Sequence, residues 1–248
     1  MPDKPENRGV KGGWYTSSIC PTKNHDGKPV RKVITPSKQT IRTSYPSIKS
    51  QKTNDCESGL ESRAAACIEL SPGVRKWAPQ PFKVRLTVNG ERKKYTPDFK
   101  ITLKSGRVKI LEVKPLRKCF DEEVHSKLVA AQLFFESDGM AFEIVTAEDM
   151  GTPIFCQNLN LLRYYMRVAF NAQERTYAQK LVSMCDHLTI LDLENKGLQK
   201  STIYSLIANN IICTDLTLPL NPNSNITLFL ENDDEKCFFS GRSAFDIK

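Results

Sequence analysis

The sequence predicts an α/β fold: a helix, a three-stranded antiparallel meander, a second helix and a further strand, followed by a second, mainly helical domain. Helical periodicity begins at residue 58, strand patterns separated by turn signals fill residues 82–113, and helical periodicity dominates after residue 150. The 248 residues are 40% hydrophobic and 26% charged, which suits one large or two small globular domains. No apolar run approaches the roughly 18–20 residues of a membrane span, so we expect no membrane segment.

The net charge of +8 is concentrated in the first half of the chain. Residues 1–55 hold 11 Lys and Arg against 4 Asp and Glu and lack periodicity, which predicts a basic N-terminal arm. Residues 75–118 hold 14 basic and 3 acidic residues, whereas residues 151–248 hold 9 and 10. Clustered cations favour a nucleic acid partner over simple solvation, because each cation that neutralises a phosphate releases counterions. We therefore expect residues 92–94 to contact DNA.

The eight cysteines are scattered singly along the chain, and no CxxC motif is present. A zinc ribbon or finger needs paired ligands at short spacing, so structural zinc is not expected. The nearest approaches to metal-binding pairs, Cys20 with His25 and Cys185 with His187, each lack a second pair. Unpaired cysteines in a chain of this length indicate reduced thiols in a cytoplasm.

The first helix is predicted to begin at Ser58. Ser58 and Glu61 fit a capping box, in which each side chain accepts a hydrogen bond from the backbone amide of the other residue. Apolar side chains follow at helical spacing, namely Leu60, Ala64, Cys67 and Ile68. The turn formers Ser71-Pro72-Gly73 end this helix.

Three strands are predicted next, over residues 82–88, 92–103 and 108–113. Asn89-Gly90 is a strong hairpin signal between the first two strands. Pro97 interrupts the second strand midway, and Lys104-Ser105-Gly106 turns the chain into the third. A helix over 121–136, with Val124, Leu128, Ala131 and Leu133 inward, and a strand over 141–145 complete a first domain of residues 56–150.

Residues 151–248 show the element order of a winged helix-turn-helix domain. Helices are predicted over 159–170, 174–186, 190–194 and 201–209, and strands over 211–218 and 226–230. The helix in the position of a recognition helix, 201–209, contains neither Arg nor Lys. Because groove-reading helices carry side chains that reach bases and phosphates, we expect this domain to dock on protein rather than read DNA.

Three charged residues converge in the meander. Glu112 and Lys114 are two residues apart on one strand, so both side chains leave the same face. If Gly106 closes a three-residue loop in the left-handed conformation, paired residue numbers sum to 210 and Asp98 falls opposite Glu112. A two-residue loop would place Asp98 opposite Val113, on the other face. Gly106 is the third residue of Lys104-Ser105-Gly106, the position that the three-residue loop requires to be left-handed.

Two carboxylates and a lysine on one sheet face are costly unless something binds there. Hard oxygen ligands suit Mg²⁺ or Mn²⁺, and the backbone carbonyl of Val113 could supply a further oxygen. Lys114 could then orient the attacking water or stabilise charge that develops on phosphorus. A surface salt-bridge cluster of Lys114 with Glu112 and Asp98 is the alternative. The apolar strand and the basic surroundings favour catalysis.

Asp98, followed by Glu112-x-Lys114 and preceded by a helix with Glu61, matches the PD-(D/E)XK nuclease pattern. More narrowly, the chain resembles the TnsA family, the endonuclease subunits of heteromeric cut-and-paste transposases. The matching stretches are Tyr45-Pro46-Ser47-Ile48-Lys49, Glu57-Ser58-Gly59-Leu60-Glu61, Gln80-Pro81, Tyr95-Thr96-Pro97-Asp98-Phe99 and Glu112-Val113-Lys114-Pro115. The resemblance implies a restriction-endonuclease-like core.

By this resemblance, Asp98 and Glu112 hold the metal and Lys114 is the catalytic lysine. Glu61 would be a further carboxylate of the site, reaching in from the first helix, although a capping role already explains a glutamate there. Gln80 beside the meander and Gln132 on the second helix could touch the cleaved strand; a solvated or capping role fits each equally well.

The resemblance also implies an activity and partners. The protein would cut double-stranded DNA at the 5′ ends of a transposon, near the bacterial nucleoid, beside a TnsB-like transposase and a TnsC-like AAA+ ATPase. Target selection by CRISPR-associated or by sequence-specific proteins is equally compatible with these motifs. A standalone restriction-type nuclease and a non-catalytic DNA-binding adaptor with a winged helix are the alternatives.

Overall fold

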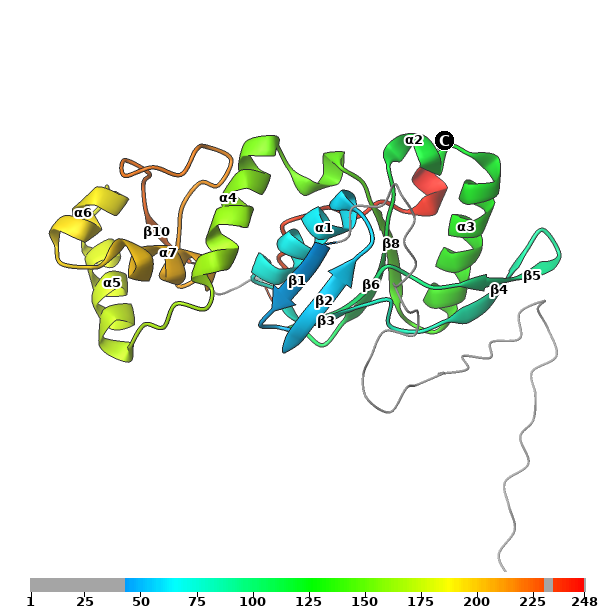
Figure 1. Ribbon diagram of the computed structural model, residues 1–248, viewed down its shortest axis with the longest axis horizontal. Helices are drawn as coiled ribbons and strands as arrows, with labels where there is room; N and C mark the ends of the chain where they lie inside the picture. The colour runs from blue at the N-terminus through cyan, green and yellow to red at the C-terminus, as the bar shows by residue number, and fades with distance from the viewer. Residues whose placement is uncertain (1–42, 230–233, 248) are drawn as a thin grey trace, which may run out of the picture.

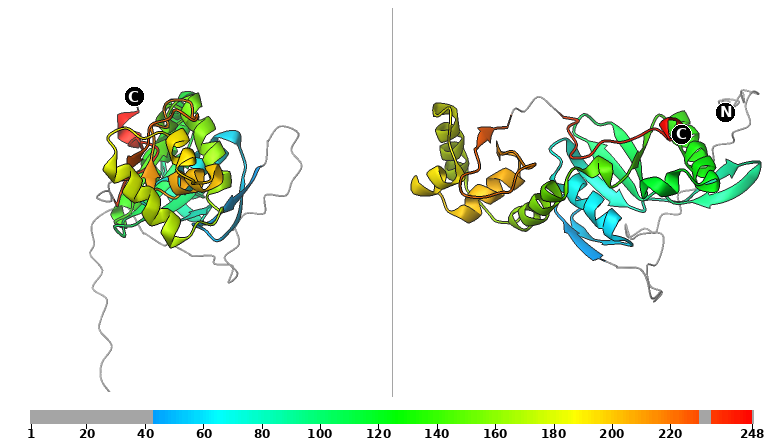
Figure 2. Two further views of the ribbon diagram at one scale, coloured as in Figure 1. Left: turned by 90° about the vertical axis from the view of Figure 1, so that its left-hand side faces the viewer. Right: turned by 90° about the horizontal axis from the view of Figure 1, so that it is seen from above.

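The computed structural model describes residues 43–229 and 234–247, which form three parts (Figure 1). Residues 43–150 form a sheet domain, residues 153–229 a helical region beside it, and residues 234–247 a tail that returns to the sheet domain. Figure 2 shows the two larger parts side by side along the long axis of the molecule. In the described part of the chain, no helix has the length and apolar character needed to cross a membrane.

The centre of the sheet domain is a four-stranded mixed sheet in the order β3-β6-β7-β8. Its strands are β3 Val74–Pro79, β6 Phe99–Leu103, β7 Val108–Val113 and β8 Ala141–Val145. Only the β7–β8 pair is parallel. Alternate strand residues pack into two cores, one with helix α1 (Gly59–Leu70) and one with helix α3 (Glu122–Ser137). The predicted α/β class is confirmed.

The predicted meander is wrong in its strand composition. The return strand expected over 92–103 is two strands, because Pro97 has no N–H to continue the ladder. Strands β4 (Val84–Val88) and β5 (Glu91–Tyr95) form a separate two-stranded hairpin, and β3 takes the place expected for β4. The sequence pattern contains no signal for β3, whose alternation is broken by a bulge between Val74 and Lys76.

Residues 43–55, expected to belong to an irregular arm, form a hairpin of β1 (Thr43–Ser47) and β2 (Lys52–Cys56). Tyr45 from this hairpin is buried in the α1 core and packs edge-on against Trp77. The hairpin is short and polar on its outer side, so its apolar content is too small to show a period. The rest of the expected arm, residues 1–42 with the Cys20–His25 pair, lies outside the described residues.

Both predicted helices of the sheet domain are present. Ser58 caps α1, and its side chain accepts a hydrogen bond from the Glu61 amide. Asp121 caps α3 in the same way, but Leu133, expected inward, is exposed, while Gln132 and Phe135 are buried. The short helix α2 (Leu116–Cys119) and the 3₁₀ turn η1 (Glu148–Met150) complete the domain.

The helical region contains four helices and one short strand pair in its described residues: α4 Pro153–Tyr165, α5 Ala172–Met184, α6 Ile190–Asn195, α7 Lys200–Ala208, β9 Ile212–Cys213 and β10 Thr227–Leu228. Helix α4 begins six residues before the expected 159, because Thr152 caps it. The strands expected over 211–218 and 226–230 shrink to two residues each. The carbonyls of Leu216 and Leu218 accept hydrogen bonds from Asn158 instead of from a neighbouring strand.

The helix expected in the recognition position, α7, is buried. Seven of its nine residues, Thr202 through Ala208, are buried within the protein. Its hydroxyls are used internally: Ser205 donates to the Val168 carbonyl at 2.6 Å. A helix enclosed in this way cannot enter a DNA groove without unpacking the region.

The tail, expected to belong to the C-terminal domain, packs on the sheet domain. Gly73 donates its amide to the Lys236 carbonyl at 2.8 Å, and Arg242 pairs antiparallel with Ile144 beside β8. The tail ends in the 3₁₀ turn η2 (Ala244–Asp246). Ala244 and Ile247 are buried in the α3 core, so the tail contributes to this core. The apolar residues of this segment follow no regular period, so the sequence could not place it.

Candidate active site

The predicted register between β6 and β7 is confirmed. Phe99 pairs with Leu111, so paired numbers sum to 210, and the Leu103 amide donates to the Arg107 carbonyl at 2.9 Å. Gly106 closes the loop with a φ of 90°, the left-handed conformation that glycine adopts at low cost. Asp98, the residue before Phe99, therefore lies opposite Glu112.

Lys114 forms ion pairs with both carboxylates at the carboxyl end of β7. Its Nζ lies 2.6 Å from Glu112 Oε1 and 3.8 Å from Asp98 Oδ2. Burial of Lys114 lowers its pKa, but the charges of Glu112 and Asp98 outweigh burial and raise the pKa above its ordinary value. Lys114 is therefore an ammonium at neutral pH, held by two acids.

Asp98 is anchored by the backbone of β7. Its Oδ2 accepts a hydrogen bond from the Val113 amide at 2.8 Å. Burial and the nearby charge of Glu112 raise the pKa of Asp98 well above its ordinary value, against the opposing charge of Lys114. Because the N–H and C=O of one strand residue leave the same edge of the strand, the Val113 carbonyl also faces the Asp98 side.

Glu61 lies beside this cluster and caps α1. Its carboxylate accepts from the Glu57 amide at 2.8 Å and from the Ser58 hydroxyl at 3.0 Å. Burial raises the pKa of Glu61, while those two hydrogen bonds and the charge of Lys114 lower it. Among the described residues no three His, Cys, Asp or Glu side chains converge closely enough to hold a metal, so Glu61 stands next to the Asp98–Glu112 pair rather than within it.

Tyr95 is a site residue that the sequence patterns did not identify. Its buried hydroxyl donates to Glu112 Oε2 at 2.6 Å. Burial and the Glu112 charge raise the pKa of Tyr95 well above its ordinary value, so it remains a donor. Its position at the end of an alternating strand, three residues before Asp98, is the signal that could have identified it.

The two glutamines have different surroundings. Gln80 lies beside the site: its backbone amide donates to the Asp98 carbonyl at 2.8 Å, and its side chain donates to Glu57. Its side-chain oxygen is buried without a partner in the described structure. Gln132 instead accepts from the Ala244 amide at 2.6 Å and therefore holds the tail.

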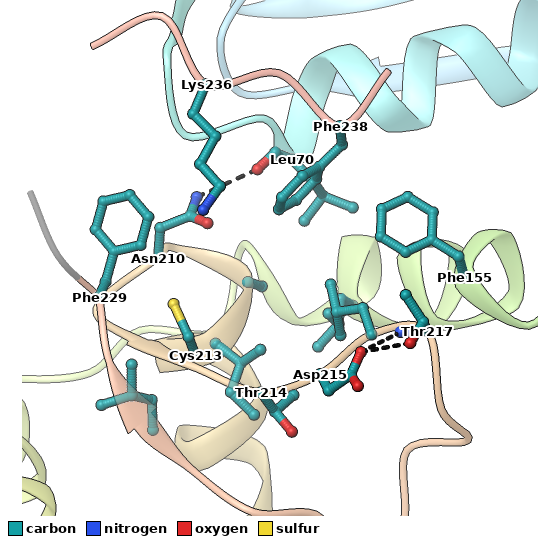
Figure 3. A pocket seen from close by; sticks show the side chains of 15 residues that line it. Leu70, Phe155, Asn210, Cys213, Thr214, Asp215, Thr217, Phe229, Lys236 and Phe238 are labelled. Carbon is teal, nitrogen blue, oxygen red and sulfur yellow. Dashed lines mark hydrogen bonds between the residues drawn. The ribbon is translucent and has the colours of Figure 1, made fainter. Parts of the chain in front are cut away.

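An apolar pocket lies at the far end of α1, between the sheet domain and the helical region (Figure 3). Leu70, Phe155 and Phe238 line it, and Asn210 donates there to the Leu70 carbonyl. Its acid, Asp215, accepts from the Thr217 backbone and hydroxyl. The pocket contains no cluster of acids and bases among the described residues that line it, unlike the group around Lys114.

The donor set at the Lys114 end fits a divalent cation. Asp98 and Glu112 offer carboxylate oxygens, and Val113 offers a carbonyl, the hard ligands that Mg²⁺ and Mn²⁺ prefer. Two carboxylates that repel each other in one partly buried place are stabilised by such a charge. Cys185 and His187, the other pair considered as ligands, belong to no group of metal ligands in the described residues.

A mixed sheet with two acids and a lysine at the end of adjacent strands is compatible with a nuclease fold. Residues 71–147 match the family model described as TnsA-like endonuclease N terminal, a segment that includes Asp98, Glu112 and Lys114. The matched segment is therefore similar to the N-terminal domain of TnsA-like endonucleases, as the motifs predicted, and the match supports a DNA endonuclease function connected with transposition. No curated protein matches the chain significantly.

Proposed function

We propose that the protein is a metal-dependent DNA endonuclease that cuts the 5′ ends of a transposon during cut-and-paste transposition. The observation that carries the proposal is the convergence of Asp98, Glu112 and Lys114 at adjacent strand ends, within the segment that matches the family. A scaffold without activity gains nothing from three partly buried charges on one face, since their desolvation costs stability.

The chain's own residues have distinct tasks in this proposal. Asp98, Glu112 and the Val113 carbonyl would hold Mg²⁺ or Mn²⁺, which supplies charge stabilisation at the scissile phosphate. Lys114 positions a water for in-line attack and stabilises negative charge on the phosphate oxygens. Tyr95 fixes one oxygen of Glu112, so that the other faces Lys114. Glu61 adds a negative charge from α1 and stabilises the start of that helix.

The partners we propose are a TnsB-like transposase and a TnsC-like ATPase, with the helical region as the docking surface. Helix α7, in the position of a recognition helix, is buried, and residues 151–248 carry 9 basic against 10 acidic residues, which does not favour phosphates. Large apolar side chains are instead exposed on α4 and α5, among them Tyr164, Tyr177 and Met184. Such side chains favour contact with protein.

A strand-specific cleavage assay tests the proposal. A duplex containing the transposon end, labelled on either strand, is incubated with Mg²⁺, the protein and both proposed partners. We expect cleavage at the 5′ end of the element, leaving a 5′-phosphate and a 3′-hydroxyl, and none with Asp98→Ala. Cleavage without the partners at a short recognition sequence would identify a restriction-type enzyme. Equal cleavage by Asp98→Ala would refute the assigned site.

A further inference from the structure

The β4–β5 hairpin projects from the sheet domain. It is a two-stranded sheet of its own, not hydrogen-bonded to the central sheet, and it packs against the side of α3. Figures 1 and 2 show it extending beyond α3 at the end of the molecule opposite the helical region. Its turn, Asn89-Gly90, has positive φ at both residues, as a tight two-residue turn requires.

The two faces of the hairpin differ in chemistry. The face toward α3 is apolar and buried: Val84, Leu86, Val88 and Tyr95. The register pairs Arg85 with Lys94 and Thr87 with Arg92, so these four exposed residues occupy the other face. That outer face therefore carries three cations and no acid.

Lys93 provides an internal contrast to these cations. It pairs with Leu86 on the α3 side and lies 3.8 Å from Glu91 and 3.5 Å from Glu123. Within residues 43–229 and 234–247, none of Arg85, Arg92 and Lys94 has a carboxylate at ion-pair distance. Strand alternation therefore turns Lys93 to the α3 side, whereas Arg92 and Lys94, with which it was expected to contact DNA, lie on the outer face.

The outer cations begin next to the candidate active site. Lys94 directly precedes Tyr95, whose hydroxyl holds Glu112. Arg92 is two residues further along the strand, about 7 Å away at the usual rise per residue. The hairpin and Glu112 lie on the α3 side of the sheet, where Tyr95 joins them, and strand alternation turns Lys94 to the outer face, opposite Tyr95.

We propose that the outer face of the β4–β5 hairpin binds the phosphate backbone of the DNA duplex beside the bond that is cut. This inference rests on the proposed function, which supplies the DNA. Three exposed arginine and lysine side chains without acidic partners suit phosphates, and their spacing along one ribbon suits successive contacts to one backbone. The apolar inner face holds the ribbon in place, so the cations are presented on a fixed support.

Binding of a labelled nonspecific duplex, measured by anisotropy in EDTA over a range of NaCl concentrations, tests the inference. The slope of log Kobs against log[NaCl] falls by about 0.9 for each lost phosphate contact. For Arg85→Gln/Arg92→Gln/Lys94→Gln we expect a slope smaller by about 2–3, in keeping with that rule. Lys93→Gln is the matched control and should leave the slope unchanged. Thermal melting of both variants verifies that they are folded.

An unchanged slope in the triple variant, or an equal change with Lys93→Gln, would overturn the inference. If the triple variant keeps the wild-type slope but loses cleavage in reactions that contain the transposase, the hairpin contacts protein. That result would also overturn the inference. Because binding is measured without cleavage, failure of the inference is distinct from failure of the proposed function. If the wild-type protein binds DNA with the larger salt-dependence slope but does not cut transposon-end DNA, only the proposed function is refuted.

Discussion

Two buried carboxylates, one near each end of helix α1, differ in the donors and charges that surround them. Near its carboxyl end, Glu69 is 2% exposed and accepts hydrogen bonds from the Ser47 hydroxyl and the Trp77 indole, both at 2.6 Å, and from the amides of Ile48 and Lys49. Near its amino end, Glu112 is 5% exposed. It shares Lys114 with a second acid and receives one further hydrogen bond, from Tyr95.

The difference is the one we expect between a structural acid and the functional acid that we propose. Four donors of the chain itself satisfy Glu69, which joins the β1–β2 hairpin to α1 and β3. Asp98 and Glu112 repel each other across a single cation, an arrangement that costs stability and that the proposed metal ion would relieve. Burial alone therefore does not identify an active site; the balance of donors and like charges around the acid does.

The largest expected effect is at the amino end of α1. Asp98→Ala, Glu112→Ala and Lys114→Ala should each lower the cleavage rate at least about 10³-fold, because each removes a charge that acts on the reacting phosphate. The free energy of unfolding should not fall for Asp98→Ala, since the variant relieves a like-charge contact. Denaturant unfolding and single-turnover cleavage measure the two quantities. If these variants lost activity only because they unfold, the site would resemble Glu69, a carboxylate that acts on stability, and the contrast would be contradicted.

Glu69→Gln should act on stability. The amide group would face donors where the carboxylate had accepted, so the free energy of unfolding should fall by about 2–4 kcal/mol. The measurement is urea unfolding followed by tryptophan fluorescence. Glu123→Gln, at a side chain that is 82% exposed, is the control and should change stability by less than about 0.5 kcal/mol. A similar small change for both variants would contradict the structural role.

Tyr95→Phe sharpens the functional side of the comparison. The variant keeps the buried ring but removes the donor to Glu112, so we expect cleavage to slow about tenfold at unchanged DNA affinity. Single-turnover rates over a series of DNA concentrations separate the two effects. A weaker affinity with an unchanged maximal rate would show that Tyr95 supports the hairpin surface rather than positioning Glu112.

The tail gives a further structural test. A Cβ at position 241 would lie 2.5 Å from Glu143 Cβ, so Gly241→Ala should displace the strand-like contact of Arg242 with Ile144. We expect a loss of about 1–3 kcal/mol in the free energy of unfolding, measured by urea. Gly59→Ala, where nothing lies within 4 Å of the added atom, is the control and should leave stability unchanged. Equal effects would mean that the tail is not part of the folded unit.

The smallest expected effect is on pH dependence. Burial raises the pKa of Asp149, but hydrogen bonds from Arg242 and Thr146 outweigh burial and lower it below the ordinary value. A lowered folded-state pKa contributes stability that is present above the ordinary Asp pKa of about 4 and is lost as the pH falls. Stability of the wild type should therefore decrease below pH about 4, and Asp149→Asn should show a shallower decrease. Glu148, the other acid facing Arg242, stays in both proteins. Parallel curves would exclude the Asp149 contribution.

Prediction from the sequence succeeded where the structure is local. The loop at Gly106 fixes the β6–β7 register over a few residues, so the spacing of residues along the chain was enough to place Asp98 opposite Glu112. The capping signal at Ser58 likewise placed α1. Both depend on neighbours in the chain, which short-range patterns report.

Prediction from the sequence failed where distant segments meet. Glu69 has the pattern of a surface residue of α1 until the β1–β2 hairpin supplies its donors, and β3 shows no alternation of its own. The tail reaches Gln132 from 111 residues away in the chain. The separation of β4–β5 from the central sheet also depends on packing against α3, which no local pattern contains.

The most direct test of the comparison is the cleavage rate constant per folded molecule for Glu112→Gln and Glu69→Gln, each at a temperature where the variant is more than nine-tenths folded. Wild-type protein measured at both temperatures is the reference. We expect Glu112→Gln to be inactive within detection and Glu69→Gln to cut at the wild-type rate. Wild-type cleavage by folded Glu112→Gln, or an inactive but folded Glu69→Gln, would contradict the division between a functional and a structural carboxylate.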